Sequence, residues 1–305
     1  MSIGRMVFLQ EEARLPKLLQ KLPLSLREKY LLHWHPYTIT KEEAYLLGVL
    51  QCPWGSGLSD VWRTKAEALL REMKASGCAI VVAPWDGEIP RQILPVSFGN
   101  VLLSLLAFEG AREALRRKGK NAEAAKFVLV GGSTQHISFV LGGIGTFVNQ
   151  LSFFHDSPSD LEEVQERLFI EHGLLSEVFS SVKNPLLSEA DVVIDCGSES
   201  PAYAFTMKKN GVWITVNGNR PGLRRLLANR PDVLAMEALF VKNKDGVEMD
   251  TRQMEAILYC ENRDFRDLWH GDISLAEDVS AMIKDAGILP SGFIALGKRQ
   301  KIAKK

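Results

Sequence analysis

An alternation of apolar and helical segments in the middle of the chain constrains the fold most. The segments 126–132, 150–156, 190–197 and 211–218 are apolar and do not alternate with polar residues. Strands of this kind have both faces covered, as in a parallel sheet between two layers of helices. Segments with helical spacing lie between them, and the run 233–241 adds a further candidate strand. The pattern predicts an α/β fold with a doubly wound, Rossmann-like parallel sheet.

The 305 residues exceed the usual size of one domain, so further structure is expected on both sides of this sheet. We predict an N-terminal α/β domain over 1–107 that binds substrate, and the Rossmann-like nucleotide-binding domain over 108–242. A long helix is predicted over 98–118, at the boundary between them. Residues 243–305 are predicted to form helices that pack back on the N-terminal domain, followed by a basic tail over 298–305.

Composition and charge exclude several classes of protein. Basic and acidic residues balance at 37 each, so no net charge attracts nucleic acid or a membrane surface. The longest apolar stretch, around 101–108, is too short to span a bilayer. The four cysteines form neither a disulfide framework nor a CxxC pair, which predicts a soluble cytoplasmic protein. His33 and His35 have no supporting cluster of Cys, Asp or Glu, so no metal site is predicted.

The turn after the first predicted strand is the candidate cofactor site. In a dinucleotide-binding fold, glycines in this turn let the backbone approach a pyrophosphate at a helix N-terminus. Gly131 and Gly132 are followed by Ser133 and Thr134, whose hydroxyls can donate to an anion. In a GxxGxxG register, however, Thr134 and Ile137 replace the later glycines, and a Cβ there hinders close approach. Two interpretations therefore stand: a phosphate-binding loop, or a structural turn in a fold that has lost its cofactor.

Further candidates follow the other predicted strands. Asp156 is placed to accept a hydrogen bond from the adenosine ribose, and its charge favours NADH over NADPH. Simple helix capping is the alternative for Asp156. Cys196, Gly197 and Asn217 come at the carboxyl ends of strands, where α/β proteins bind ligands. For Cys196 the alternative is a small apolar residue that fills the core.

Several short motifs occur in a characteristic order along the chain. LGVLQCPWGSG and CAIVVAPW lie in the N-terminal part, PVSFGN covers 95–100, and RQMEAILYCENRDF and LAEDVSAMIKDAGILP lie near the C-terminus. With the order of elements, they make residues 45–295 resemble the long-chain acyl-carrier-protein reductases and the predicted amino-acid dehydrogenases grouped with them. That family has a Thr-Gly-Asn segment where PVSFGN stands. The resemblance therefore implies that Gly99 and Asn100 bind substrate.

The same resemblance implies covalent chemistry at a cysteine. A thioester reductase needs a thiolate that accepts the acyl group and a nicotinamide that supplies a hydride. Cys260 matches the position of the family's nucleophile within a residue or two. Arg263, three residues later, is predicted to share a helical face with Cys260 and to favour the thiolate. The alternative is that Cys260 packs in a helix with Met254 and Ile257.

Three functions follow from these alternatives. The first is an NAD(P)-dependent oxidoreductase that reduces an acyl thioester through a cysteine acyl-enzyme, with NADH or NADPH and a small-molecule or acyl-carrier substrate. The second is a non-catalytic Rossmann-fold protein that has lost its dinucleotide site and binds a small molecule or a protein partner. The third is a shikimate-type dehydrogenase without a covalent step. No nucleic-acid partner and no membrane span are expected, and assembly into a homo-oligomer is left open.

Overall fold

The computed structural model describes residues 2–10, 21–23, 25–26, 37–41, 45–52, 60–83, 92–180, 186–197, 206–217 and 220–300. The chain forms two compact units: Met1–Phe98 with Glu255–Arg266, and Gly99–Met254 with Asp267–Lys305. The units thus differ from the predicted domains 1–107, 108–242 and 243–305. Only a short part of the C-terminal region belongs to the first unit, because the chain returns there for 255–266 and then leaves again.

The first unit is built on a five-stranded sheet in the order β2-β3-β1-β4-β5. Strands β2 and β3 pair antiparallel, and the other neighbours pair parallel. Helix α2 covers the sheet with its buried residues Leu69, Leu70 and Met73 and ends before Gly77, whose φ of 89° suits a residue without a Cβ. The elements are β1 (Ser2–Gln10), β2 (Tyr37–Lys41), β3 (Tyr45–Cys52), α2 (Asp60–Ala75), β4 (Cys78–Val82) and β5 (Val96–Ser97).

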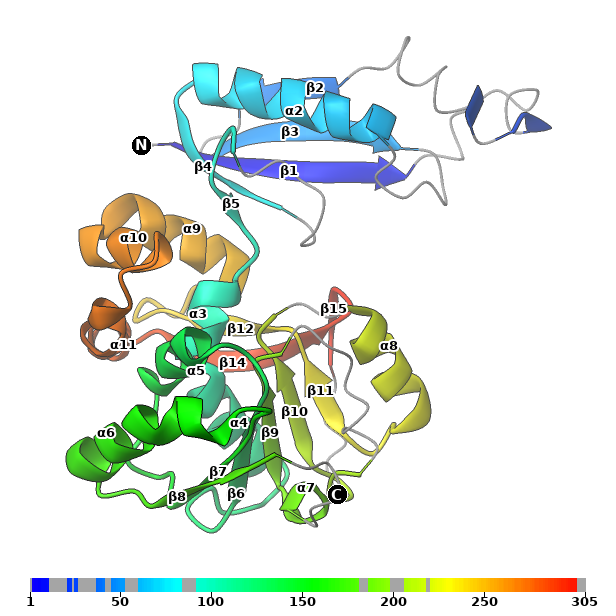
Figure 1. Ribbon diagram of the computed structural model, residues 1–305. Helices are drawn as coiled ribbons and strands as arrows, with labels where there is room; N and C mark the ends of the chain where they lie inside the picture. Colours follow the sequence, from blue (N-terminus) through cyan, green and yellow to red (C-terminus); the bar gives the residue numbers. More distant parts are fainter. Residues whose placement is uncertain are drawn as a thin grey trace. The chain divides into compact units, whose positions relative to one another are not determined.

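The second unit contains a six-stranded, all-parallel sheet in the order β11-β10-β9-β6-β7-β8 (Figure 1). Numbered by their sequence order within the sheet, the strands run 3-2-1-4-5-6 from one edge to the other, which is the order of a dinucleotide-binding fold. The predicted Rossmann-like sheet is therefore confirmed. Its strands are β6 (Lys126–Val130), β7 (Gln150–Phe154), β8 (Ser176–Phe179), β9 (Val192–Asp195), β10 (Val212–Thr215) and β11 (Leu234–Met236).

Helices cover both faces of this sheet, as a doubly wound fold requires. On one face Val193 and Trp213, neighbours in register, pack in a core that also holds Leu223 of α8. On the other face the ring of Phe127 lies 5.8 Å from that of Phe108 in α4. The helices are α4 (Ala107–Arg117), α5 (Thr134–Leu141), α6 (Glu162–His172), α7 (Leu186–Glu189) and α8 (Arg220–Asn229), with a 3₁₀ turn η2 (Pro158–Leu161) before α6.

The helix predicted over 98–118 is broken at Leu106 into α3 (Asn100–Leu105) and α4. The carbonyl of Leu105 packs against Gly143, where a Cβ would lie only 2.0 Å from that oxygen. Gly143 lies just beyond α5, which ends at Leu141. Close packing of two backbones therefore explains both the break and the glycine.

A second, antiparallel sheet in this unit was not predicted; its order is β13-β12-β14-β15. The run 233–241 is interrupted at Glu237: the segment before it forms β11, the last strand of the parallel sheet along the chain, and the segment after it forms β12 of the antiparallel sheet. The start of the predicted basic tail, 298–305, forms β15, where Arg299 pairs with Glu248 at 2.8 Å. The strands are β12 (Ala238–Lys242), β13 (Glu248–Asp250), β14 (Leu289–Ala295) and β15 (Lys298–Arg299).

The rest of the C-terminal region is helical, as predicted. Its elements are α9 (Thr251–Glu261), α10 (Arg263–Trp269), a 3₁₀ turn η4 (Ile273–Leu275) and α11 (Ala276–Asp285). No helix in the described ranges combines the length and the apolar character needed to cross a bilayer.

Candidate functional site

The candidate site lies at the carboxyl ends of β6 and β9. These two strands are neighbours, but the chain continues from β6 to β7 on one side and from β9 to β10 on the other. Such a switch point leaves a crevice between the diverging connections, and open α/β sheets bind ligands there. The structure brings four predicted residues together at this point: Gly131 and Gly132 after β6, and Cys196 and Gly197 after β9.

The two turns pack so closely that both leading glycines are required. Gly131 and Gly132 have φ values of 64° and 87°, a region that residues with a Cβ rarely adopt. A Cβ at Gly132 would lie 2.8 Å from both Cβ and the carbonyl oxygen of Cys196. A Cβ at Gly131 would lie 3.1 Å from Cα of Gly197. The glycine turn, Gly131–Gly132, is therefore packed closely against the β9 turn, Cys196–Gly197.

The hydroxyls that follow the glycine turn have partners within the protein. Ser133 caps α5, since its Oγ accepts from the backbone N–H of His136 at 3.2 Å. The Thr134 hydroxyl donates to the carbonyl of Asp160 at 3.3 Å. Ile137 is buried in the core, so its side chain does not fill the space in front of the turn. The steric objection to a phosphate is therefore smaller at Ile137 than the glycine pattern suggests.

His155, which follows β7, holds the glycine turn from the other side. Its Nε2 lies 3.0 Å from the carbonyl oxygen of Gly132, and the backbone N–H of Ser157 donates to its Nδ1 at 3.1 Å. Nδ1 also lies 2.9 Å from the carbonyl oxygen of Ser157, so the ring is held between the glycine turn and the start of the segment that leads to η2. The neighbouring Asp156 is exposed and has no hydrogen bond or ion pair with any described residue. His155 was not predicted, because a single histidine after a strand carries no motif.

On the other side of the switch point, Asn217 follows β10 and contacts the end of β9. The Asn217 side chain donates from Nδ2 to the carbonyl of Cys196 and so ties the end of β10 to the end of β9. Cys196 is fully buried, and burial, with the adjacent Asp195, raises the pKa of its thiol. The Cys196 thiol is therefore part of the buried core, while the Cβ and the carbonyl oxygen of Cys196 pack against the glycine turn.

Asp195, the last residue of β9, is the principal site residue that the sequence did not indicate. It is 3% exposed, and burial raises the pKa of its carboxyl to about 7, although the N–H of Gly197 donates to Oδ1 at 3.1 Å and opposes this shift. Its Oδ2 has no hydrogen-bond partner among the described residues. The same is true of the buried hydroxyl of Thr215, which stands beside Asp195 in register. A buried polar atom without a partner is uncommon and indicates a functional role.

The predicted substrate residues Gly99 and Asn100 lie at the start of α3. Gly99 has a φ of 80°, and a Cβ there would lie 2.9 Å from the backbone nitrogen of Arg252 and from Oγ1 of Thr251. Asn100 does not cap the helix with its side chain, and its carbonyl accepts from the hydroxyl of Ser104 at 2.8 Å. Packing against the start of α9 therefore accounts for Gly99, and a role in substrate binding stays a prediction for both.

The predicted arrangement of Cys260 and Arg263 on one helical face is wrong. Helix α9 ends at Glu261, and Asn262 begins α10 by accepting from the N–H of Phe265 at 2.7 Å. Arg266 reaches the end of α9 and donates to the carbonyl of Cys260 at 3.1 Å. Burial raises the pKa of the partly exposed Cys260 thiol, and the charge of Arg266 acts against this shift. Cys260 belongs to the first compact unit and the glycine turn to the second.

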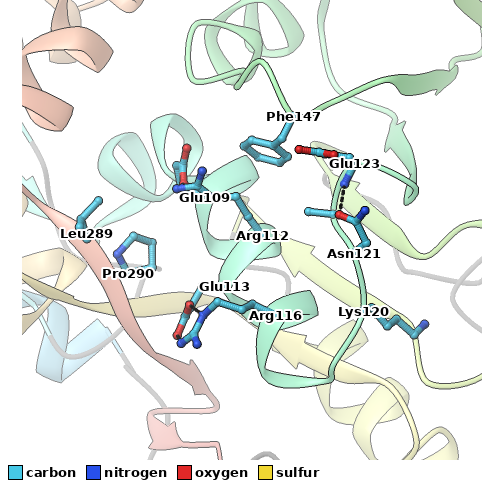
Figure 2. Close-up of a pocket in the computed structure, with 11 residues that line it drawn as sticks. Glu109, Arg112, Glu113, Arg116, Lys120, Asn121, Glu123, Phe147, Leu289 and Pro290 are labelled. Atoms are coloured by element: carbon cyan, nitrogen blue, oxygen red, sulfur yellow. Dashed lines mark hydrogen bonds and ion pairs between the residues drawn. The ribbon is translucent and has the colours of Figure 1, made fainter.

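A cavity of about 500 Å³ lies beside α4, away from the switch point (Figure 2). Its wall includes residues 121–123, which lead into the amino end of β6, whereas ligands of this fold bind at the carboxyl ends. Its charges are mutually neutralised: Arg112 pairs with Glu109 at 2.6 Å, and Arg116 pairs with Glu113 at 2.6 Å. The cavity is therefore not the candidate site.

One group of metal-ligating side chains is present in the described residues. The ligand atoms of Glu171, His172 and Glu277 lie within 4.8 Å of one another, and all three residues are exposed. They belong to the C-terminal end of α6 and the first turn of α11, far along the chain from the switch-point residues. His33 and His35 lie outside the described residues.

Comparison with solved structures gives a likeness of fold only. L-tryptophan dehydrogenase from Nostoc punctiforme matches with a TM-score of 0.37 and 14% identity over 94% of this chain and 84% of that chain. Shikimate 5-dehydrogenase from Listeria monocytogenes, solved with shikimate and NAD, matches with a TM-score of 0.32 and 10% identity over 77% of this chain and 86% of that chain. Δ1-Pyrroline-2-carboxylate reductase from Thermococcus litoralis, solved with NADH and L-proline, matches with 0.29 and 11% over 42% of this chain and 40% of its own length.

Carbamoyltransferases also match, with TM-scores of 0.36 and 0.29 for the aspartate and ornithine enzymes. Scores and identities this low do not distinguish one activity from another. The sequence matches no protein-family model, and no curated protein matched it. The assignment of the fold therefore rests on the strand order of the sheet itself.

Proposed function

We propose that the chain is an oxidoreductase that uses a nicotinamide dinucleotide. The observation that carries this proposal is the strand order 3-2-1-4-5-6 with the glycine turn at its switch point. The two glycines of that turn carry no Cβ, and α5 begins at Thr134, soon after them. Backbone N–H groups at a helix N-terminus favour a pyrophosphate. Because the glycine turn fits this group, we assign the diphosphate to it.

The rest of the cofactor follows from the two halves of the sheet. The adenosine half lies over β6 and β7 in this fold, which puts its ribose next to Asp156. The nicotinamide half lies over β9 and β10, next to Gly197 and Asn217. An exposed carboxylate at Asp156 accepts hydrogen bonds from ribose hydroxyls and repels a 2′-phosphate. We therefore propose NADH as the preferred cofactor.

Calorimetric titration with NADH and NADPH tests this assignment. We expect NADH to bind more tightly, and we expect Asp156→Ala to weaken NADH binding while narrowing its difference from NADPH. Asp160→Ala is the matched control, since Asp160 is also exposed and uses its backbone carbonyl, not its side chain, to hold Thr134. Equal loss of NADH affinity in both variants would contradict the assignment of the ribose. Absence of binding for either cofactor would reject the proposed function.

Reduction of an acyl thioester is the finer form of this proposal. The Cys260 sulfur would attack the acyl carbon and release the carrier thiol, and the new carbon–sulfur bond would break once the carbon is reduced to an aldehyde. A bound nicotinamide supplies the hydride for that reduction. Support comes from the partial exposure of Cys260 and from the positive charge of Arg266 beside it. Burial opposes it, because it lowers the fraction of thiolate at neutral pH.

Cys260→Ser separates the covalent route from the other candidates. Loss of turnover with unchanged cofactor affinity is expected if Cys260 carries the acyl group. Full turnover would instead favour a dehydrogenase without a covalent step, of the shikimate type. A non-catalytic protein is favoured by one further observation: close packing alone accounts for both glycines of the turn. That alternative predicts no binding of any dinucleotide.

A further inference from the structure

A buried carboxyl lies directly beside the glycine turn. Asp195 stands in register with Val130, the residue that precedes the turn. The position of a Cβ at Gly197 lies 3.5 Å from Oδ1 of Asp195, 3.7 Å from Cα of Gly131 and 3.8 Å from the backbone nitrogen of Gly132. The carboxyl and the backbone of the turn thus surround the same point. A phosphate that approaches the turn also approaches Asp195.

The surroundings of Asp195 favour its neutral form. Its side chain lies on the same face of the sheet as Val193, two residues earlier in β9, and as Trp213, the partner of Val193 in β10. Val193 and Trp213 both belong to a buried apolar core. One oxygen accepts from Gly197, and Oδ2 has no partner among the described residues. Burial of an unpaired carboxylate is costly, so the proton is held more tightly than on an exposed carboxyl.

Among the described residues, few titratable groups face Asp195 from the elements around it. The Cys196 thiol is adjacent and feels the charge of the carboxylate. His155 contacts the glycine turn through the carbonyl of Gly132. From β10 the facing residue is Thr215, which does not titrate. A control variant at His155 must therefore separate its contribution from that of Asp195.

We propose that a diphosphate at the glycine turn binds together with one proton, which Asp195 holds. This inference rests on the proposed function, because it concerns the same site. A carboxylate beside the diphosphate would repel it, whereas the protonated carboxyl is neutral and can donate from Oδ2. When Asp195 is ionised in the free protein, binding takes one proton from the solvent onto Oδ2. Affinity then falls by up to about tenfold for each pH unit in the alkaline range.

ADP-ribose is the probe, because the charge of its diphosphate does not change across the alkaline pH range. It also lacks the nicotinamide, so its binding reports on the diphosphate and adenosine parts of the site. Calorimetric titration at about pH 8, in two buffers with different heats of ionisation, counts the protons taken up by the wild-type protein. We expect uptake that approaches one proton. Asp195→Asn is expected to bind with no uptake and to keep its affinity up to about pH 9. Thr215→Val and His155→Gln are matched controls that should retain the uptake.

The outcomes separate this inference from the function on which it rests. Binding of ADP-ribose or NADH without proton uptake overturns the inference and leaves the cofactor site intact. Uptake that persists in Asp195→Asn but disappears in His155→Gln also overturns it. If neither ligand binds to the wild type or to Asp195→Asn at any pH, both proposals fail. If Asp195→Asn does not fold, uptake by the wild type that His155→Gln retains supports the inference, and binding by the wild type without uptake overturns it.

Discussion

Replacing Asp195 with asparagine tests how the buried carboxyl is linked to folding. The folded protein holds the proton up to about pH 7, whereas an unfolded chain loses it near the ordinary value of 3.8. Between these values the folded state binds one proton more than the unfolded state, so the free energy of unfolding falls as the pH rises. The stabilisation is present in full below about pH 4 and is lost as the pH passes through about 7.

The magnitude follows from the difference between the two pKa values. About three units at about 1.4 kcal/mol each amount to about 4 kcal/mol. Asparagine does not titrate, so the stability of Asp195→Asn relative to the wild type should rise by up to about 4 kcal/mol between about pH 4 and about pH 8. Thr215→Val removes the neighbouring buried hydroxyl without removing a titrating group. Its stability relative to the wild type should therefore not depend on pH.

Because the chain has two compact units, the assay must report on the unit that holds Asp195. Pulse-labelling hydrogen exchange of peptides from β9 and β10, along a urea titration at each pH, gives that local free energy. A constant difference between Asp195→Asn and the wild type at all pH values would refute the reasoning. It would mean that the carboxyl is solvated or paired in solution, and that burial does not control its proton.

Three further predictions concern the turn and the thiol. Gly132→Ala should destabilise the second unit by more than the roughly 1–2 kcal/mol that left-handed backbone strain alone costs, because the new Cβ meets Cys196. Gly119, with a φ of 69° and open space around it, is the control, and Gly119→Ala should show the cost of the strain only. Thermal unfolding of both variants measures the difference. His155→Ala should cost about 1 kcal/mol through the lost hydrogen bond to the turn, measured by urea unfolding. Iodoacetamide should alkylate Cys260 more slowly at neutral pH than it alkylates a free thiol, because burial raises the pKa of Cys260. The rate should fall further in Arg266→Ala, because the charge of Arg266 favours the thiolate. An unchanged rate in that variant would contradict the electrostatic role of Arg266.

The sequence predicted most strands of the parallel sheet because those at its centre, such as β9 and β10, are fully buried and almost entirely apolar, whereas the partly buried β8 (SEVF) was not predicted. Apolar character also concealed the boundary at Glu237, since VLAMEALFV is one apolar run although β11 and β12 belong to different sheets. Strand β14 was missed because LPSGFIA begins with turn-forming residues. The break at Leu106 carries no glycine or proline and arises from a contact with Gly143, which lies far along the chain. Such long-range contacts leave no local pattern.

The site was predicted in part for similar reasons. Gly131 and Gly132 have a recognisable position after a strand, so the turn was found. Asp195 was not, because its burial depends on the neighbouring strands and on the turn that follows, and the segment VVIDCG resembles an ordinary strand end. The separation of Cys260 from Arg263 had a local signal that was overlooked. Asn262 followed by a charged first turn is a common helix start, and it ends the helix before it.

The return of residues 255–266 to the first unit delays its completion during synthesis until most of the second unit has been made. Domains generally fold from the N-terminus as synthesis proceeds, at about 5–20 residues per second. Here all six strands of the parallel sheet have been made before Glu255 is added, but the first unit still lacks 255–266 and the second still lacks 267–305. A nascent chain arrested before Glu255 would therefore carry two unfinished units, and neither could be completed without the C-terminal part of the chain.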